Sequence, residues 1–313
     1  MYISMKILIF ICICSFPFIS LFGQKKAEAE IEAQILFEKA VLLHTLPEEL
    51  ALTQGKDSIS FQYAKELEND IYEEALDLYK TFIEKYPKSK LIYRALYNKG
   101  SLERYLKMNW EANNTFQVLL NSKANDQEKG GKGSGIMAEP YANYKHEAAK
   151  ELTLIAIEYK SYEEALKYLD LMKKYPYHHF CGNEYATDEI YTQGLYAQCY
   201  IGLNENQKAI QVLLPSLLEN GLADNSALVQ TLYDILIKLY SKDSLKAQYE
   251  YAFKNYQSKT IKRKKNSYDI LFIKFLDTEI ELPVDSFYQK KESLDKRINH
   301  IYTDSLFYKL LSQ

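Results

Sequence analysis

The segment Tyr72-Glu73-Glu74-Ala75-Leu76-Asp77-Leu78-Tyr79-Lys80-Thr81-Phe82-Ile83-Glu84-Lys85-Tyr86-Pro87 decides the fold of this chain. A close copy runs from Tyr162 to Pro176. Both copies open with Tyr-Glu-Glu-Ala-Leu and close with Lys-Tyr-Pro, and the second is one residue shorter. Each places apolar residues at helical spacing and ends at a proline, which stops a helix. Such long-range self-similarity indicates helical units that are stable only when stacked.

The first copy resembles the second helix of a tetratricopeptide (TPR) repeat. The residues that carry the resemblance are Ala75, Tyr79, Phe82 and Pro87. In that family the small alanine is where another helix comes close, and it recurs here at Ala112, Ala165 and Ala209. The resemblance implies an all-α fold, an α-α superhelix of four recognisable helix pairs within residues 24–258.

Helix boundaries follow from apolar spacing and from the breaks between the periodic segments. We expect helices at 25–44, 58–69, 71–86, 89–107, 109–121, 141–159, 161–175, 184–201, 205–219, 226–240 and 243–256. Helix 58–69 would pair with 71–86, and the helices at both ends would act as caps. Pro47 and the stretch 53–57 are expected to break the first helix.

The 89–107 helix departs from the TPR pattern at two positions. Gly100 takes the small position, with Ala112, Phe116 and Leu119 following in the next helix, but Lys99 and Glu103 stand where apolar residues are expected. The register of this helix is therefore open.

A glycine-rich run interrupts the pattern within residues 121–139. A phosphate-binding loop needs a preceding apolar strand and a Gly-Lys-Ser/Thr ending that opens a helix. Here the run follows a predicted helix and ends Gly-Lys-Gly-Ser. We therefore expect a flexible loop between repeats and not a nucleotide site.

Residues 1–23 are predicted to be a secretory signal. Lys6 precedes sixteen uncharged, mostly apolar residues, Ile7 to Phe22, whereas a membrane span needs about 20. Cleavage after Gly23 would leave Gln24 as the new terminus. We expect export, with the periplasm as the destination; an uncleaved N-terminal membrane anchor is the alternative.

The C-terminal extension, residues 259–313, resembles no known family. Its basic start, 258–266, is predicted to be a solvated linker, with binding to acidic surfaces such as anionic lipid or polyanionic glycan as the alternative. The segment 270–282 partly alternates between apolar and polar residues, so a short strand or a helix is expected there. A final helix is expected over 287–311.

The composition excludes several functions. The chain is 47% hydrophobic and 26% charged, with a net charge of -3, so it has no basic bias for nucleic acid. His178, His179 and Cys181 form its one metal-like cluster, and zinc sites need four closely spaced ligands. We expect no metal, no cofactor and no enzyme activity, because no thiol or histidine lies in a catalytic signature.

Cys181 and Cys199 are the cysteines that remain after signal removal. An exported protein with two cysteines would ordinarily be expected to form a disulfide. If a helix begins near Glu184, however, Cys199 lies roughly 22 Å along it, and a disulfide needs Cα atoms within about 7 Å. We expect no disulfide between them.

A binding face is predicted on the 89–107 helix. It consists of Arg94, Tyr97, Ser101, Arg104 and Tyr105, spaced i, i+3, i+7, i+10 and i+11. With Gly100 as the small position, the TPR resemblance implies that this face lines the concave groove. Arginine beside tyrosine suits a partner that carries carboxylates. In the alternative, the arginines pair with glutamates of a neighbouring helix.

The resemblance implies a module that binds a protein or peptide partner. The Tyr-Pro endings are similar to TPR units of bacterial envelope-assembly proteins, which together with export suggests a periplasmic scaffold. The alternatives are a structural subunit anchored by its N-terminal helix and a solenoid that binds a glycan or small ligand in tyrosine-lined grooves. Membrane contact is expected only through the N-terminal segment or the basic linker.

Overall fold

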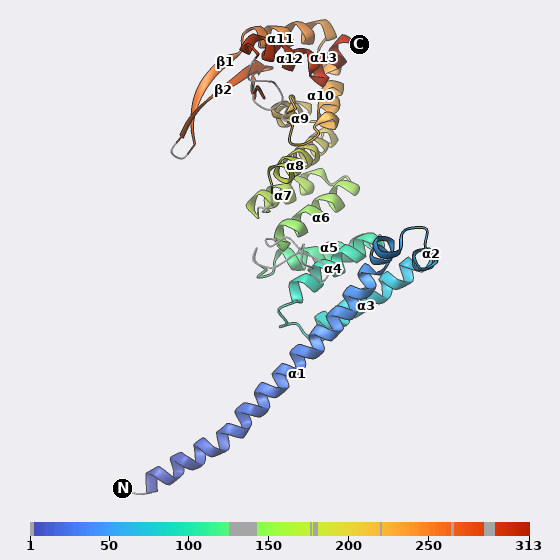
Figure 1. Ribbon diagram of the computed structural model, residues 1–313, viewed down its shortest axis with the longest axis vertical. Coiled ribbons are helices and arrows are strands. Elements are labelled where there is room, and N and C mark those ends of the chain that lie inside the picture. The colour runs from blue at the N-terminus through green and yellow to red at the C-terminus, as the bar shows by residue number, and fades with distance from the viewer. Residues whose placement is uncertain are drawn as a thin grey trace. The chain divides into compact units, whose positions relative to one another are not determined.

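The computed structural model describes residues 3–124, 143–175, 177, 181–219, 221–263, 266–284 and 292–313. The side chains of 3–26, 263, 266 and 268 are outside this description. The chain forms two compact units, Met1–Leu152 with Tyr175–Tyr177, and Thr153–Lys174 with His178–Gln313. Helices make up most of each unit, and a small sheet lies near the C-terminus (Figure 1). The predicted class, all-α with a short strand in the C-terminal extension, is confirmed.

The first unit is built from helices that pack on their neighbours in sequence. Its helices are α1 (Ile3–Gln54), α2 (Ile59–Glu66), α3 (Glu68–Lys85), α4 (Ile92–Tyr105), α5 (Asn109–Leu120) and the start of α6 (Tyr144–Glu158). The predicted partnership of 58–69 with 71–86 is wrong, because α3 packs chiefly against α1 and α4. Phe37 of α1 shares a buried cluster with Tyr79 and Phe82 of α3. These large apolar side chains form a wider contact than the short α2 can offer.

Helix α1 is longer than the predicted 25–44 and passes through Pro47. A proline inside a helix removes one backbone hydrogen bond and crowds the preceding turn. Pro47 is itself buried, so the packing of its ring offsets part of that cost. The helix ends instead just before Gly55, whose φ of 82° suits glycine after a helix C-terminus.

The small positions predicted for helix crossings are buried in both units. The four alanines have no exposed surface: Ala75 of α3, Ala112 of α5, Ala165 of α7 and Ala209 of α9. Gly100 of α4 lies against Phe116 of α5, and a Cβ added at Gly100 would be 2.7 Å from Cζ of that ring. Close approach of paired helices therefore depends on these residues, as the predicted helix pairs require.

Lys99 and Glu103, the two departures from the TPR pattern, form a polar network with Thr115 of α5. Lys99 Nζ donates to Glu103 Oε1 and to Thr115 Oγ1, each at 2.6 Å. Thr115 Oγ1 donates to Glu103 Oε2, also at 2.6 Å. The Glu103 side chain is only 1% exposed, so its charge is compensated inside the helix pair.

Buried tyrosines in the first unit keep their hydroxyls hydrogen-bonded. Tyr79 has no exposed surface, and its hydroxyl accepts a hydrogen bond from Asn98 Nδ2 at 3.0 Å. His44 Nδ1 of α1 lies 3.4 Å from the same oxygen. Burial raises the pKa of Tyr79, so the hydroxyl stays neutral. One side chain thus links α1, α3 and α4.

The second unit continues the helix pairs. It contains α7 (Tyr162–Lys174), α8 (Gly182–Gly202), α9 (Asn206–Leu213), the 3₁₀ turn η1 (Leu214–Ser216), α10 (Ser226–Leu239) and α11 (Lys242–Lys254). Helix α8 packs on α7 and α9, and α9 packs on α10. The predicted helix 205–219 is shorter, because Pro215 tightens its end into η1.

The C-terminal extension begins with a three-stranded antiparallel sheet of order β1-β2-β3. Its strands are β1 (Gln257–Arg263), β2 (Asn266–Phe275) and β3 (Thr278–Glu281). The strand expected within 270–282 is therefore present. The linker predicted at 258–266 is wrong over β1, where a backbone ladder pairs Gln257 with Phe272 and Arg263 with Asn266.

The single helix predicted over 287–311 is also wrong. It is replaced by α12 (Leu294–Asp304) and α13 (Leu306–Ser312), while 287–291 lie outside the described residues. Ser305 separates them with an extended ψ of 138°. Its hydroxyl accepts from the backbone N–H of Tyr308 at 3.3 Å, which caps α13. The glycine-rich loop predicted between repeats falls mostly on residues 125–142, outside the described residues.

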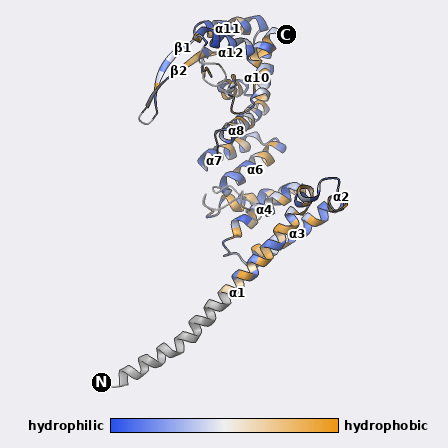
Figure 2. Cartoon of the chain, viewed as in Figure 1, coloured by the Kyte–Doolittle hydropathy of each residue, from blue (hydrophilic) through white to orange (hydrophobic). Residues whose placement is uncertain are grey.

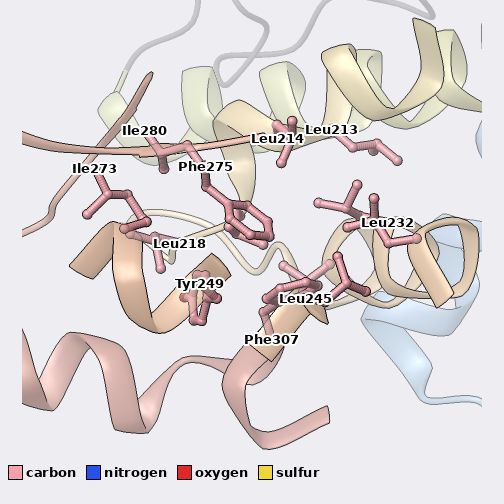
Figure 3. Close-up of a cluster of buried hydrophobic side chains, with 14 of the residues drawn as sticks. Leu213, Leu214, Leu218, Leu232, Leu245, Tyr249, Ile273, Phe275, Ile280 and Phe307 are labelled. Carbon is pink, nitrogen blue, oxygen red and sulfur yellow. The ribbon is translucent and has the colours of Figure 1, made fainter. Parts of the chain in front are cut away.

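The sheet and the last helices complete the core of the second unit. In Figure 3, Ile273, Phe275 and Ile280 of the strands lie with Leu232, Leu245 and Tyr249 of the helices around one apolar interior. Tyr249 packs among other aromatic rings: its ring centroid lies 5.3 Å from that of Phe275 and 5.1 Å from that of Phe307. Its hydroxyl donates to Ser305 Oγ at 3.1 Å. The extension is therefore held by the same core as α9–α11.

Gly100→Ala tests the close packing of α4 on α5. Alanine favours a helix by roughly 0.5–1 kcal/mol, but the added Cβ meets the fully buried Phe116 ring, and overpacking costs about 1–3 kcal/mol. We expect a net loss of stability in thermal or urea unfolding. Gly182→Ala is the control, because its Cβ meets nothing within 4 Å. Equal effects of the two substitutions would contradict the packing.

Candidate partner-binding surfaces

The predicted binding face lies on α4, but its residues do not act as one surface. Arg94, Tyr97, Ser101, Arg104 and Tyr105 all belong to this helix or end it. Tyr97 and Arg104 contact α6, whereas Tyr105 contacts α3. Ser101 bonds within its own helix, its hydroxyl donating to the carbonyl of Tyr97 at 3.0 Å. Their assignment as partner-binding residues stays a prediction.

Tyr97 and Arg104 connect α4 to α6. The Tyr97 ring is 5.8 Å from the ring of Tyr144 and 6.4 Å from that of Phe116. Arg104 Nε lies 3.5 Å from Glu151 Oε2, and its Nη1 donates to Asn109 Oδ1 at 2.5 Å. For Arg104, the alternative of pairing with a neighbouring glutamate is therefore confirmed.

Tyr105 faces the opposite neighbour. Its ring stands edge-on to Tyr72, with centroids 4.8 Å apart, and its hydroxyl donates to Glu68 Oε2. Burial alone would raise the pKa of Glu68, but hydrogen bonds from Lys65 and Tyr105 lower it. Burial, with the charge of Glu68, raises the pKa of Tyr72 to about 12. Tyr105 thus supports the α3–α4 contact while half of its surface stays exposed.

Arg94 is the residue of the predicted face with spare hydrogen-bonding capacity. Its Nε is buried without a hydrogen-bond partner, although the side chain as a whole is partly exposed. A buried donor left unpaired costs about 1–3 kcal/mol. A carboxylate is the ligand that fits a guanidinium best.

Glu151 gives this surface its electrostatic character. Burial raises the pKa of its carboxyl group, the charge of Arg104 opposes that shift, and the charge of Glu147 adds to it. Desolvation therefore outweighs the ion pair, which is long at 3.5 Å. Burial also raises the pKa of Tyr97, with Glu147 and Glu151 nearby.

A second surface, in the second unit, is an apolar groove of about 750 Å³. We call it the α8–α10 groove, because these two helices supply most of its walls. Its lining residues are Tyr162, Thr187, Ile190, Tyr191, Gly194, Leu195, Ala197, Gln198, Ile201, Gly202, Leu213, Ala227, Leu228 and Thr231. Apolar periodicity in the sequence did not predict this groove. Tyr191 and Ile201 are exposed apolar residues on its α8 wall, but their spacing in the sequence does not distinguish them from core positions.

Two glycines of α8 shape this groove. A Cβ at Gly194 would lie 3.3 Å from Leu228 of α10, and one at Gly202 would overlap the ring of Tyr162. The missing side chains let α8 approach both neighbours and keep the groove open.

Thiol chemistry has little support in the second unit. Cys181 is exposed at the start of α8, Cys199 is buried within it, and both are free. The helix predicted to separate them is present, and spans about 26 Å between Gly182 and Cys199 at the usual rise. Burial raises the pKa of Cys199 to about 11, which keeps it as an unreactive thiol.

The described residues contain no group of three or more His, Cys, Asp and Glu side chains that could hold a metal ion. The predicted cluster cannot be placed there, because His178 and His179 lie outside that part of the chain. Within the same limits, no helix combines the length and the apolar character needed to cross a membrane.

Comparisons with known proteins add little. No family model matches the chain, and no curated protein matches it. Among solved structures, the MamA RS-1 ArsTM double mutant is 15% identical with a TM-score of 0.39, over 66% of this chain and 88% of that one. MamA 41-end from Desulfovibrio magneticus RS-1 is 17% identical with a TM-score of 0.39, over 64% and 85%. At these TM-scores the likeness supports no conclusion about this chain.

Glu151→Gln tests the electrostatics of the α4–α6 contact. Because the folded-state pKa of Glu151 is raised, the wild type gains stability as the pH falls through that value towards the ordinary 4.5. The variant lacks this gain. We expect the melting temperature of the wild type, relative to the variant, to rise between pH 7.5 and pH 4.5.

The control is Glu73→Gln, which removes one charge from an exposed position on α3. Thermal melts of the three proteins across the pH range provide the measurement. If the difference between wild type and Glu151→Gln stays constant or falls on acidification, the inferred direction of the Glu151 pKa shift is wrong.

Proposed function

We propose that this chain is an exported, non-enzymatic scaffold of TPR type that binds a protein or peptide partner. The observation that carries the proposal is the α8–α10 groove. Its volume falls within the range of about 300–1,000 Å³ typical of binding pockets, and its lining combines apolar side chains with a few polar ones. Tyr191 and Ile201 remain partly exposed there, so apolar surface is available to a partner.

The groove favours a segment with apolar side chains. Apolar anchors gain by leaving water, at about 25 cal/mol per Å² of buried surface. Thr187, Gln198 and Thr231 supply polar groups that could fix the backbone of the bound segment.

Arg94 on α4 supports a separate contact in the first unit. Its side chain is partly exposed, and a guanidinium suits a carboxylate-bearing partner. Arg104 is already engaged by Glu151, so it contributes to the shape of this surface more than to its free charge. Arg94→Ala therefore tests this contact more specifically than a variant that also replaces Arg104, because Arg104 supports the packing of α6.

We further propose that the protein acts in envelope assembly or in a periplasmic complex. This rests on the sixteen-residue apolar segment after Lys6 and on the TPR resemblance of the Tyr-Pro endings. An uncleaved anchor that holds the protein at the membrane is the alternative for the same segment.

A glycan or small-molecule ligand is the second candidate function. The observation that favours it is the pair Tyr162 and Tyr191 in the lining of the α8–α10 groove, because aromatic rings stack on the faces of sugars. Protein capture that persists in excess sugar would favour the scaffold. Capture abolished by sugar would favour a glycan as the ligand.

The double variant Tyr191→Ala plus Ile201→Ala tests the groove. Both side chains are partly exposed, so their removal should spare the fold while deleting apolar contact area. We expect capture of partners from envelope extract to fall at least about tenfold, since truncating buried interface anchors typically costs more than ~1 kcal/mol each. Quantitative pull-down with mass spectrometry gives the readout.

The matched control is Ile237→Ala plus Tyr251→Ala, which removes exposed apolar side chains of the same unit outside the groove. It should leave capture unchanged. Equal capture by wild type and both double variants would show that the groove is not the binding site.

Cleavage of the signal is tested by intact-mass spectrometry of protein expressed with its full N-terminus in a Gram-negative host and recovered by fractionation. We expect periplasmic protein that begins at Gln24. Protein of full mass in the membrane fraction would support the anchor instead, and full-length protein in the cytoplasm would contradict export.

A further inference from the structure

The sheet of the second unit extends into a two-stranded ribbon that carries no buried side chain among its described residues. Strand β1 pairs with residues 266–272 of β2, whereas β3 pairs only with Phe272 to Phe275. Burial on β2 begins at Phe272. The ribbon beyond it projects away from α11 and α12 (Figure 1). A hairpin of two strands is only marginally stable alone in water, so the presence of this projecting ribbon requires an explanation.

The ribbon concentrates positive charge. Between Gln257 and Leu271 the sequence has five basic residues, Lys259, Lys262, Arg263, Lys264 and Lys265, and one acidic residue, Asp269, for a net of +4. The whole chain has a net charge of -3, so the remainder is acidic. Lys264 and Lys265 lie outside the described residues, and the inference rests on the strand residues before them.

Charges near the base of the ribbon are already engaged within the sheet. Lys259 pairs with Glu279 of β3 and lies 4.7 Å from the centroid of the Phe272 ring. Asp269 accepts a hydrogen bond from Thr260 Oγ1 at 2.6 Å. Farther out, the exposed Lys262 stands opposite Ser267, and Arg263 is opposite Asn266. Positive charge at this end therefore has no acidic residue opposite it in the ladder.

Each face of the ribbon carries a basic residue. Ile261 and Ile270, both half-buried, share one face by strand alternation and register. The other face carries Thr260, Lys262 and Asp269. Figure 2 shows the hydrophilic character of β1 beside the more hydrophobic β2. Lys259 shares the face of the isoleucines, because it is paired with Ile270. Apolar and basic residues side by side are a combination found in elements that lie at a membrane surface.

We propose that the β1–β2 ribbon docks on the surface of an anionic lipid bilayer. The ribbon would touch the bilayer with its free end, where Lys262 and Arg263 close β1 beside the lipid phosphates. Ile261, on the opposite face from Lys262, would rest at the boundary of the headgroups. A ribbon only two strands wide offers far less than the roughly 800 Å² per partner of a specific protein interface. A second copy of the ribbon would bring like charges together. A projecting end can touch a flat surface while the acidic remainder of the chain stays away from it.

Lysine acetylation of the full chain on vesicles tests the contact directly. The vesicles are pure phosphatidylcholine or phosphatidylcholine with about one-third phosphatidylglycerol, a fraction that gives an anionic surface. We expect Lys262 to be protected on the anionic vesicles alone, and Lys85 and Lys88 of the first unit to be labelled equally on both. Because the readout is local, insertion of the N-terminal apolar segment does not mask it. Equal labelling of Lys262 on both vesicles would overturn the proposal.

Vesicle co-sedimentation of variants supplies the second test, after subtraction of binding to phosphatidylcholine alone. Lys262→Gln plus Arg263→Gln should weaken anionic binding about 25-fold, at roughly fivefold for each cation. Lys85→Gln plus Lys88→Gln removes the same charge from exposed positions and should change it little. If both variants lose the same amount of anionic binding, the effect depends on net charge alone, and the assignment of the contact to the ribbon is overturned. Heparin binding as strong as vesicle binding, with the same loss in the ribbon variant, would identify a soluble polyanion and overturn the choice of lipid.

Discussion

Helices that pack side by side lie about 8–10 Å apart, which leaves room for no more than a small side chain where they cross. In this chain Ala75, Ala112, Ala165 and Ala209 fill those positions without exposed surface. At Gly100 even the Cβ of an alanine would be too large, because the Phe116 ring occupies that space. The large buried residues four places after the alanines can pack only because the helices have come this close; they are Tyr79, Phe116, Leu169 and Leu213. The groove along α8 depends on the same device at Gly194 and Gly202.

The abundance of tyrosine fits this architecture. A closely packed helix pair buries large rings, but a buried hydroxyl needs a hydrogen-bond partner. Tyr79 accepts from Asn98, and Tyr249 donates to Ser305. Burial raises the pKa of both hydroxyls, so they remain neutral groups within the core. Each tyrosine thereby joins segments that are distant in the sequence, 19 residues apart for Tyr79 and Asn98 and 56 for Tyr249 and Ser305.

Local spacing predicted the helices and their small positions because those depend on neighbours within a turn or two. It could not predict that buried packing would carry α1 through Pro47, or that a serine would divide the last helix at Ser305. Strand β1 was not predicted, because its basic sequence shows no strand pattern and the residues of β2 that pair with it follow later in the chain. At the predicted binding face, periodicity placed five residues on α4 but gave no information about Glu68 or Glu151. Those partners are set by the stacking of neighbouring helices, as is the α8–α10 groove.

The network of Lys99, Glu103 and Thr115 limits which helix can pair with α4. Repeat proteins risk mispairing during folding because their units look alike. The residues three places after the other buried alanines are Leu78, Tyr168 and Val212. Leucine and valine offer no hydrogen bond, and the Tyr168 hydroxyl already donates to Glu164 at 2.9 Å. Placing α4 against any of them would leave Glu103 Oε2 without the hydrogen bond that Thr115 donates, and a buried acceptor left unpaired costs about 1–3 kcal/mol. Two residues that break the repeat pattern thus discriminate among otherwise interchangeable helices and favour the correct neighbour as the chain folds.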